Sequence, residues 1–334
     1  MNATPALVEL RGVSKRFGRR ADFTERAVRV LARRGPLPSV RALDHVDLVV
    51  REGEVVGLVG ESGCGKSTLG RIVARALEPS EGERLWKGEP YARFDAGSER
   101  RERLAVQMIF QDPFASLNPR MRIVDIVGEA AVVHGLVPRR ERDEYVAGIL
   151  GRVGFDPALM RRFPHQFSGG QRSRIGIARA LAVQPRFLVC DEAVAALDVS
   201  VQAQVLNLFV RLREELGLTY LFISHDLSVV RHLSDRVVVM YLGRVVETAP
   251  ARTLFAAPRH PYTQALLAEL PRMDLRRRDY VPIRGEIPSP LAPPPGCHFH
   301  PRCPHAFERC RHEAPALRAL DDGHLSACHL NETP

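Results

Sequence analysis

Three features that many proteins carry are absent from this sequence or scarce in it. The chain of 334 residues contains no apolar run long enough to form a membrane-spanning helix. Residues 1–6 have neither the positively charged start nor the apolar core of a secretion signal. Six cysteines are few for a disulfide-rich scaffold. We therefore expect a soluble, cytoplasmic globular protein with room for one large domain or two unequal ones.

Positive charges outnumber negative charges in this chain. The formal net charge is +9, and arginine carries most of the positive charge. A basic balance of this size is compatible with nucleic acid, an anionic membrane surface or an acidic partner, and charge alone does not choose between them. Residues 18–40 are basic and irregular, which predicts a surface insertion.

A glycine-rich loop follows an apolar run at residues 54–59 and precedes a helical pattern at residues 69–77. This order predicts a phosphate-binding P-loop, in which glycines let the backbone N–H groups turn toward phosphate oxygens. Lys66 is expected to reach the outer phosphates, and the Ser67 hydroxyl is expected to bind magnesium. The predicted nucleotide-binding residues here are Gly60, Glu61, Ser62, Gly63, Cys64, Gly65, Lys66, Ser67 and Thr68.

Two acidic residues, Asp191 and Glu192, follow a short apolar run at residues 187–190. Such a run predicts a central strand of a parallel sheet, and acidic residues at its carboxyl end face the ligand crevice. Asp191 can hold magnesium, and Glu192 can accept a proton from an attacking water. Without a P-loop, two adjacent carboxylates would indicate only a solvated turn.

Gln111 and His225 also follow apolar runs that predict strands, at residues 108–110 and 220–224. Gln111 is placed to meet both a metal ion and a bound water. His225 would point toward the same crevice and could contact the γ-phosphate, although a lone histidine is more often structural or exposed.

A second helix entrance is formed by Ser168, Gly169, Gly170 and Gln171, before a helix predicted at residues 172–181. Its free N–H groups and its hydroxyl suit a phosphate. In isolation the same residues fit an N-cap followed by a flexible turn better than a phosphate site.

Other segments give a coarser prediction. Residues 6–17 alternate like a strand that ends in an exposed Phe17, which could stack on adenine or serve only in packing. Residues 78–101 are polar and turn-rich. Residues 123–154 repeat apolar side chains at helical spacing, which predicts a helical subdomain at about residues 112–165.

The order of these pieces resembles the ATP-binding cassette (ABC) superfamily across residues 6–270. GESGCGKST is followed by Gln111, FSGGQ, FLVCDE, AALD and His225, and P-loop proteins in general lack the SGGQ element. The resemblance implies an α/β fold, namely a P-loop ABC nucleotide-binding domain with a mixed sheet core, an inserted α-helical subdomain and a small, irregular C-terminal extension. It also implies ATP and Mg²⁺ as ligands.

The resemblance further gives each motif a role. Phe17 resembles the adenine-stacking aromatic, residues 60–68 the Walker A loop and Gln111 the Q-loop glutamine. Ser168 to Gln171 resemble the signature, Asp191 and Glu192 the Walker B pair, Asp198 the D-loop aspartate and His225 the switch histidine.

Longer stretches resemble the ATPases of oligopeptide and dipeptide importers within that superfamily. They are FQDPFASLNPR, FSGGQRSRIGIARAL, LDVSVQAQVLNL, HPYTQALL and, from residue 285, GEIPSPLAPPPGCHFHPRCPHAFERC. The LGR after the P-loop and the basic insertion resemble the second, F-type, of two paired ATPases. Importers of nickel, glutathione or opines share much of this sequence and stay as alternatives. We expect an ATP-binding domain at residues 1–270 and a C-terminal domain at residues 271–334.

Two positions depart from the family pattern. Ala193 and Ala195 stand where the family usually has proline and serine, which loosens the turn after Glu192 and weakens contacts across the ATPase interface. Because Glu192 and His225 are retained, we expect a working ATPase, with Lys66 and Gln111 completing the catalytic set.

The resemblance implies a multi-subunit machine at the cytoplasmic face of the cell membrane. In the family two cassettes meet head to tail, so that the P-loop of one and the Ser-Gly-Gly of the other hold each ATP. The expected partners are a paralogous ATPase subunit, two membrane-spanning permease subunits and, through the complex, an extracytoplasmic solute-binding protein. The rival is an ABC ATPase that acts on nucleic acid, but the coiled coils or zinc insertions of that class are missing, so no nucleic-acid partner is expected.

Four of the six cysteines, Cys297, Cys303, Cys310 and Cys328, fall in the last 40 residues. This tail is proline-rich with little periodicity, so a staple would help it to fold. The unequal spacings fit an iron–sulfur cluster at least as well as zinc, and a reducing cytoplasm disfavours disulfides. Because members of the resembled subfamily can carry a four-iron cluster there, we expect a [4Fe–4S] cluster, with Zn²⁺ and free thiols as alternatives.

Overall fold

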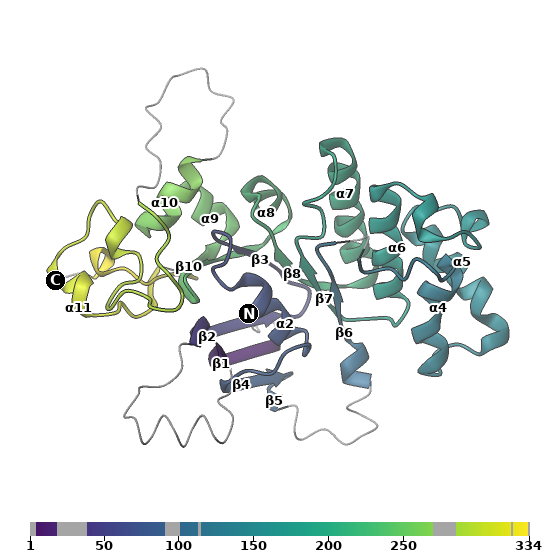
Figure 1. Cartoon of the computed structure of the whole chain (residues 1–334), viewed down its shortest axis with the longest axis horizontal. Helices are drawn as coiled ribbons and strands as arrows, with labels where there is room; N and C mark the ends of the chain where they lie inside the picture. The colour runs from purple at the N-terminus through teal and green to yellow at the C-terminus, as the bar shows by residue number, and fades with distance from the viewer. Residues whose placement is uncertain are drawn as a thin grey trace, which may run out of the picture.

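The structure is a computed structural model, and the residues that it describes are 5–18, 39–90, 101–112, 115–269, 285–321 and 323–332. A group of helices lies at one end of the long axis, two sheets lie in the middle and the C-terminal extension lies at the other end (Figure 1). The basic insertion predicted at residues 18–40 falls, from residue 19 to residue 38, outside the described part of the chain.

A mixed sheet forms the centre of the molecule. Its parallel part has the strand order β9, β3, β8, β7, β6, and these strands are β3 (Val55–Val59), β6 (Val106–Ile109), β7 (Phe187–Asp191), β8 (Thr219–Ile223) and β9 (Arg236–Tyr241). The strands β3, β7 and β8 are buried along their whole length, which explains why they are continuous apolar runs in the sequence. Because parallel strands end at one edge, the residues that follow β3, β6, β7 and β8 are brought together there.

Antiparallel strands extend this sheet toward the C-terminus. β10 (Arg244–Pro250) pairs with β9, β12 (His324–Ser326) pairs with β10, and β11 (Arg318–Asp321) pairs with β12. The extension is otherwise largely irregular, as predicted, but the sequence did not indicate that part of it joins the main sheet. Strands of three and four residues carry too little alternation to be detected by pattern.

A second, antiparallel sheet has the strand order β2, β1, β4, β5. Its strands are β1 (Ala6–Gly18), β2 (Ser39–Arg51), β4 (Glu81–Trp86) and β5 (Glu89–Pro90). The prediction of a polar, turn-rich segment at residues 78–101 missed β4. Exposed residues fill the first half of that strand, and only Leu85 and Trp86 are buried, so pairing with β1 rather than local pattern defines it.

Helix α2 (Lys66–Val73) lies between the two sheets (Figure 1). Its buried side chains Leu69 and Ile72 belong to one hydrophobic cluster with Val56 and Leu58 of β3 and with residues of β1 and β2. Packing on both sides fixes the start of α2, and therefore the position of the loop that precedes it.

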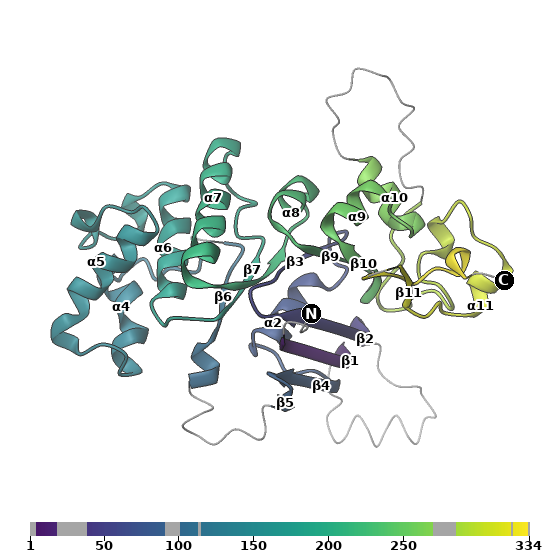
Figure 2. The same ribbon diagram turned by 180° about the vertical axis from the view of Figure 1, so that it is seen from behind.

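A helical region lies beyond β6 (Figures 1 and 2) and contains α4 (Ile123–Val133), α5 (Arg142–Arg152), α6 (Gly169–Leu181) and α7 (Val199–Leu216). Their apolar faces form one cluster, in which Val127, Val146, Ile175 and Phe209 are fully buried. Helices α4 and α5 lie within the segment predicted to be helical, residues 123–154, because the three-four spacing that predicted them is the spacing that packs them together.

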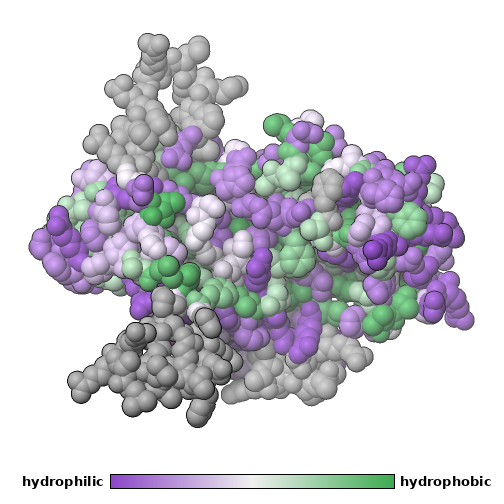
Figure 3. Space-filling model, in the orientation of Figure 1, coloured by the Kyte–Doolittle hydropathy of each residue, from purple (hydrophilic) through white to green (hydrophobic). Residues whose placement is uncertain are grey.

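Further helices cover the face of the main sheet opposite α2: α8 (Leu227–Leu233), α9 (Ala251–Ala256) and α10 (Pro261–Ala268). The extension contains α11 (Glu308–His312), and single 3-10 turns occur at Arg139–Glu141, Pro157–Leu159, Pro164–Gln166, His300–Arg302 and His329–Asn331. The face in Figure 3 is mostly hydrophilic with small apolar patches. Within the described ranges, no helix combines the length and the apolar character that crossing a bilayer requires.

Candidate functional site

Two glycines hold the loop between β3 and α2 close to neighbouring strands. Gly60 has a φ of 151°, and a Cβ atom there would lie 2.2 Å from the carbonyl oxygen of Met240 in β9. Gly65 has a φ of 107°, and a Cβ atom there would lie 2.3 Å from the carbonyl oxygen of Ala42 in β2. Any side chain at either position would push the loop off the sheets, so the loop conformation requires glycine at both.

Lys66, the first residue of α2, folds back over this loop. Its ammonium donates hydrogen bonds to the carbonyl oxygens of Gly60, at 2.7 Å, and of Glu61, at 3.0 Å. The residue is only 5% exposed. A helix N-terminus with a buried ammonium beside it suits anionic oxygens, which is compatible with the phosphate site that the sequence predicts at residues 60–68.

Ser67 and Asp191 meet at the carboxyl edge of the main sheet. The Ser67 hydroxyl donates a 2.9 Å hydrogen bond to Oδ1 of Asp191, the last residue of β7. Burial raises the pKa of Asp191, and the hydrogen bond from Ser67 and the charge of Arg71 oppose that rise. A hydroxyl and a carboxylate oxygen placed together are the hard oxygen donors that Mg²⁺ prefers, so these two residues fit the predicted magnesium site.

Glu192 is held by the two side chains that sequence analysis placed beside it. Its Oε2 accepts a 2.6 Å hydrogen bond from Nε2 of Gln111, and its Oε1 lies 3.4 Å from Nδ1 of His225. The three residues follow β7, β6 and β8, so the parallel sheet assembles them. Glu192 has a φ of 49°, a left-handed conformation that costs about 1–2 kcal/mol in a non-glycine residue. Such strain is concentrated at functional sites.

Gln111 contacts Glu192, whereas the structure records no contact between Gln111 and the Ser67–Asp191 pair among the described residues. The assignment of Gln111 as a magnesium ligand therefore stays a prediction. Its amide is placed to orient the carboxylate of Glu192.

Ser168 to Gln171 form the N-terminus of α6. The Ser168 N–H donates to the Gln171 side chain at 3.0 Å, and the Ser168 hydroxyl accepts from the Gln171 N–H at 3.4 Å, which makes a capping box. A Cβ atom at Gly170 would lie 2.3 Å from Cγ1 of Val201, so α7 packs tightly against this turn. In Figures 1 and 2, α6 lies with α4, α5 and α7, on the far side of β6 and β7 from α2. Among the described residues, the recorded side-chain neighbours of Ser168, Gly169 and Gly170 are Gln171, Leu197 and Val201, and no contact with the P-loop is recorded.

Two more predicted residues lie at the surface. Phe17, near the end of β1, is 43% exposed, with the Lys15 ammonium 5.4 Å from its ring centroid. Asp198 is exposed at the N-cap of α7 and makes no side-chain capping hydrogen bond. Both are accessible to a ligand or to a second cassette.

The four C-terminal cysteines lie in buried or half-buried positions of the extension. Burial raises the pKa of Cys297 and Cys303 and raises the pKa of Cys328 to about 11, and neighbouring thiols of the group add to each rise. All four cysteines are described, yet in the described part of the chain no three His, Cys, Asp or Glu side chains are arranged to hold a metal ion. The predicted [4Fe–4S] cluster and the zinc alternative therefore have no support from the described geometry, and the mechanism below does not depend on either.

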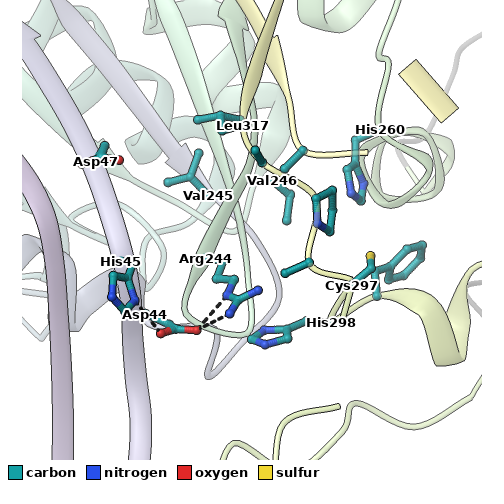
Figure 4. Close-up of a pocket in the computed structure, with 15 residues that line it drawn as sticks. Asp44, His45, Asp47, Arg244, Val245, Val246, His260, Cys297, His298 and Leu317 are labelled. Carbon is teal, nitrogen blue, oxygen red and sulfur yellow. Dashed lines mark hydrogen bonds and ion pairs between the residues drawn. The ribbon is translucent and has the colours of Figure 1, made fainter. Parts of the chain in front are cut away.

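A cavity of about 270 Å³ lies where β2 and β10 meet the extension (Figure 4). Its charged residues are already paired, because Arg244 donates to Asp44 at 2.8 Å and His45 lies 3.0 Å from the same carboxylate. His298 lies 3.2 Å from the Leu242 carbonyl oxygen, and burial, with the charge of Arg244, lowers its pKa to about 4. No motif residue of the P-loop lines this cavity, so it is separate from the phosphate site.

Comparison with known proteins agrees with this geometry. A family model described as ABC transporter matches residues 43–195, and a second, described as the oligopeptide/dipeptide transporter C-terminal region, matches residues 246–310. Over 328 residues, which are 97% of both chains, the sequence is 48% identical to the oligopeptide transport ATP-binding protein AppF of Bacillus subtilis. The chain belongs to the ABC transporter ATP-binding proteins.

Other members of the ABC family support the same assignment. The chain is 50% identical over 295 residues to a probable peptide ABC transporter ATP-binding protein, y4tS, of Sinorhizobium fredii, covering 88% of this chain and 84% of that one. The post-hydrolysis dimer of the ATP-binding cassette MJ0796, bound to ADP and phosphate, is similar with a TM-score of 0.62 and 27% identity, over 73% of this chain and 99% of that one. The cbiO1 structure from Clostridium perfringens gives a TM-score of 0.62 and 26% identity, over 76% and 92% of the two chains.

These matches confirm the predicted ABC family and the predicted P-loop cassette fold. As an ABC ATP-binding protein, the chain is an ATPase that drives transport across a membrane, which makes it one subunit of an assembly with membrane-spanning permeases. The match to the C-terminal family model begins at residue 246, inside β10, and the division of the chain at residues 270 and 271 stays a prediction.

Sequence reasoning missed the residues that brace the ABC P-loop from outside. Glu61 bonds through its carboxylate to Arg302 of the extension and through its N–H to the hydroxyl of Tyr262. The available signals were the HPYTQALL and HPRC stretches, which resemble the family but have no chemical pattern of their own.

Proposed function

We propose that this chain is the ATP-hydrolysing subunit of an importer that takes up di- and oligopeptides. The observation that carries the proposal is one chain in which a complete ABC nucleotide site is followed by an extension resembling the C-terminal region of oligopeptide/dipeptide transporters. Relatives named for oligopeptide or peptide transport cover almost the whole chain, which favours peptides over nickel, glutathione or opines. The single cassette and this extension also disfavour a nucleic-acid-associated ATPase.

In this proposal the chain's own residues bind and polarise the triphosphate. Residues 60–65 and the N-terminus of α2 surround the phosphates, and Lys66 exchanges its carbonyl partners for phosphate oxygens. Phe17 stacks on the adenine. Mg²⁺, when bound by Ser67 and Asp191, supplies further positive charge to the phosphates.

Glu192 is the general base of the proposed reaction. Its carboxylate, held by Gln111 and His225, accepts a proton from the water that attacks the γ-phosphorus. The hydrogen bond from Gln111 and the 3.4 Å contact with His225 limit the orientations of the carboxylate, which is the geometric condition for in-line attack. Ala193 and Ala195 lie in the turn after this residue, where the Ala195 N–H donates to the Glu192 carbonyl oxygen at 3.1 Å.

The site is completed by a second cassette. Because no contact joins Ser168, Gly169 or Gly170 to the P-loop among the described residues, we propose that they contact the ATP of a paralogous subunit, with Asp198 at the interface. ATP binding then closes the pair and hydrolysis opens it. Dimeric cassettes among the similar structures support this arrangement.

The surroundings follow from the same proposal. The chain sits at the cytoplasmic face of the membrane through two permease subunits, which receive peptide from an extracytoplasmic solute-binding protein. We retain the division into an ATP-binding domain at residues 1–270, with a helical subdomain at about residues 112–165, and a C-terminal domain at residues 271–334.

The decisive experiment isolates the tagged chain from its native membranes with its bound subunits and reconstitutes the complex in lipid nanodiscs. ATP turnover is measured with the solute-binding protein and, in turn, di- to pentapeptides, nickel, glutathione and opines. Stimulation by peptides and vanadate-trapped nucleotide cross-linked to Ser168 are the expected results. Stimulation by another solute alone would overturn the peptide assignment, and a trapped complex with Ser168 remote from nucleotide would overturn the shared site.

A further inference from the structure

The P-loop carries a carboxylate that the C-terminal extension holds. Nη1 and Nη2 of Arg302 donate to the two carboxylate oxygens of Glu61 at 2.7 and 2.9 Å. The two side chains are only 5% and 20% exposed. A two-point guanidinium–carboxylate contact away from water is among the strongest polar contacts that proteins make. It joins residues that are 241 positions apart in the sequence.

Two tyrosines outside the extension contact the two partners of this ion pair. The hydroxyl of Tyr241, in β9, lies 3.3 Å from Nη1 of Arg302, and the hydroxyl of Tyr262, in α10, accepts a 2.8 Å hydrogen bond from the Glu61 N–H. The rings of Tyr241, Tyr262 and Phe299 pack with centroids 4.8–5.4 Å apart. Glu61 is therefore fixed at its main chain by the cassette and at its carboxylate by the extension.

Glu61 passes this constraint to the phosphate site. Its carbonyl oxygen accepts a hydrogen bond from the Lys66 ammonium at 3.0 Å, and the next carbonyl back, that of Gly60, accepts another at 2.7 Å. If Arg302 were absent, a free carboxylate would remain on the loop that has to receive a triphosphate. That charge would repel the phosphates, and Glu61 would lose the contact with Arg302 that helps to fix its position in the loop.

We propose that Arg302 is a positioning residue for ATP binding, through which the C-terminal extension sets the affinity of the P-loop for nucleotide. Arg302 neutralises Glu61 and holds the loop in the conformation that Lys66 requires, without touching the reacting atoms. The proposal gives the extension a role in the nucleotide site of its own chain. It rests on the P-loop site proposed above, so the experiment includes a variant of that site.

The test uses the full-length chain and measures the Kd of a fluorescent ATP analogue, with KM and kcat measured in the assembled complex. Arg302→Ala is expected to raise Kd and KM about 10-fold, because it leaves a partly buried carboxylate unpaired, while kcat stays within about twofold. Arg302→Lys, which keeps the charge but loses the two-point contact, is expected to raise Kd about threefold. Adding Glu61→Gln to Arg302→Ala removes the unpaired charge and is expected to restore Kd to within about threefold of wild type.

The matched control is Arg309→Ala, since Arg309 lies in the same extension and pairs with Glu313 at 2.7 Å, away from the loop. It is expected to bind the analogue like wild type. Wild-type Kd in both Arg302 variants would overturn the proposal. So would a weakened Arg302→Ala that Glu61→Gln does not rescue, because a purely structural loss would persist in the double variant. Lys66→Ala separates the two proposals. Tight binding of the analogue by Lys66→Ala would refute the P-loop site itself. Loss of binding in Lys66→Ala, together with wild-type Kd in the Arg302 variants, would refute the positioning role alone.

Discussion

Replacing Glu192 by glutamine is expected to stop ATP turnover and to leave ATP binding intact. The carboxylate accepts a 2.6 Å hydrogen bond from Gln111, and its second oxygen lies 3.4 Å from Nδ1 of His225. A glutamine has the same size, and its amide oxygen can still accept from Gln111, so the crevice keeps its shape. The amide cannot accept a proton from water, so only the general-base step is removed.

The size of the effect follows from that role. Loss of a positioned general base lowers kcat by about 10²- to 10⁴-fold. By the relation of about 1.36 kcal/mol per tenfold, the barrier rises by about 2.7–5.4 kcal/mol. The affinity for ATP should not fall, because Lys66 and the loop N–H groups are unchanged and the variant removes a negative charge from the crevice.

The assay measures phosphate release by the assembled complex at saturating Mg-ATP, together with equilibrium binding of a fluorescent ATP analogue. Glu215→Gln is the control, since Glu215 is an exposed residue of α7 that pairs with Arg211, another exposed residue, at 3.7 Å. Its turnover should match wild type within about twofold, as expected for a surface ion pair. Turnover of Glu192→Gln within about threefold of wild type would refute the assignment of Glu192 as the base.

Three further predictions concern stability. Asp191→Asn is expected to raise the thermal unfolding midpoint at pH 7 while abolishing hydrolysis, because burial raises the pKa of Asp191 and so makes its ionised form unfavourable in the folded chain. The difference in midpoint between the variant and wild type should vanish below the ordinary pKa of a carboxyl group. A lower midpoint for the variant at pH 7 would contradict this prediction. Burial lowers the pKa of His260 and of His298 to about 4, so both stay neutral in the folded chain while the unfolded chain takes up protons below the ordinary histidine pKa of 6.5. Urea unfolding should therefore show stability falling as the pH drops between those values, by up to about 2.7 kcal/mol per pH unit, and a flat profile would argue against buried neutral histidines. Gly60→Ala should destabilise the chain by about 1–3 kcal/mol or more, given the 2.2 Å approach to Met240, whereas Gly148→Ala, on the open face of α5, should be neutral or stabilising by up to about 1 kcal/mol.

Much of the catalytic site could be predicted from the sequence because its determinants are local. Gly60 and Gly65 indicate the loop, since no other residue tolerates those backbone positions. Continuous apolar runs indicate β7 and β8, and the residues that follow them must reach one edge of a parallel sheet. The contacts of Glu192 with Gln111 and His225 are therefore a consequence of strand order and of short loops after each strand.

Elements that depend on a distant partner could not be predicted in this way. Strand β4 is mostly exposed and polar, and it forms because its backbone pairs with β1. Strand β12 forms because it pairs with β10, and β11 forms because it pairs with β12. The cysteine spacings predicted a metal centre, but spacing does not determine how thiols are oriented, and the described side chains are not arranged to hold a metal ion.

The sequence alone determined that this protein carries a P-loop, a signature turn and a strand-end carboxylate pair, because glycine, capping and apolar periodicity act over a few neighbouring residues. Only the tertiary structure decided that Arg302 binds the Glu61 carboxylate and that the Tyr262 hydroxyl accepts from the Glu61 N–H. An ion pair between residues 241 positions apart leaves no local pattern, because folding of the intervening chain, not the identity of its neighbours, brings the two charges together.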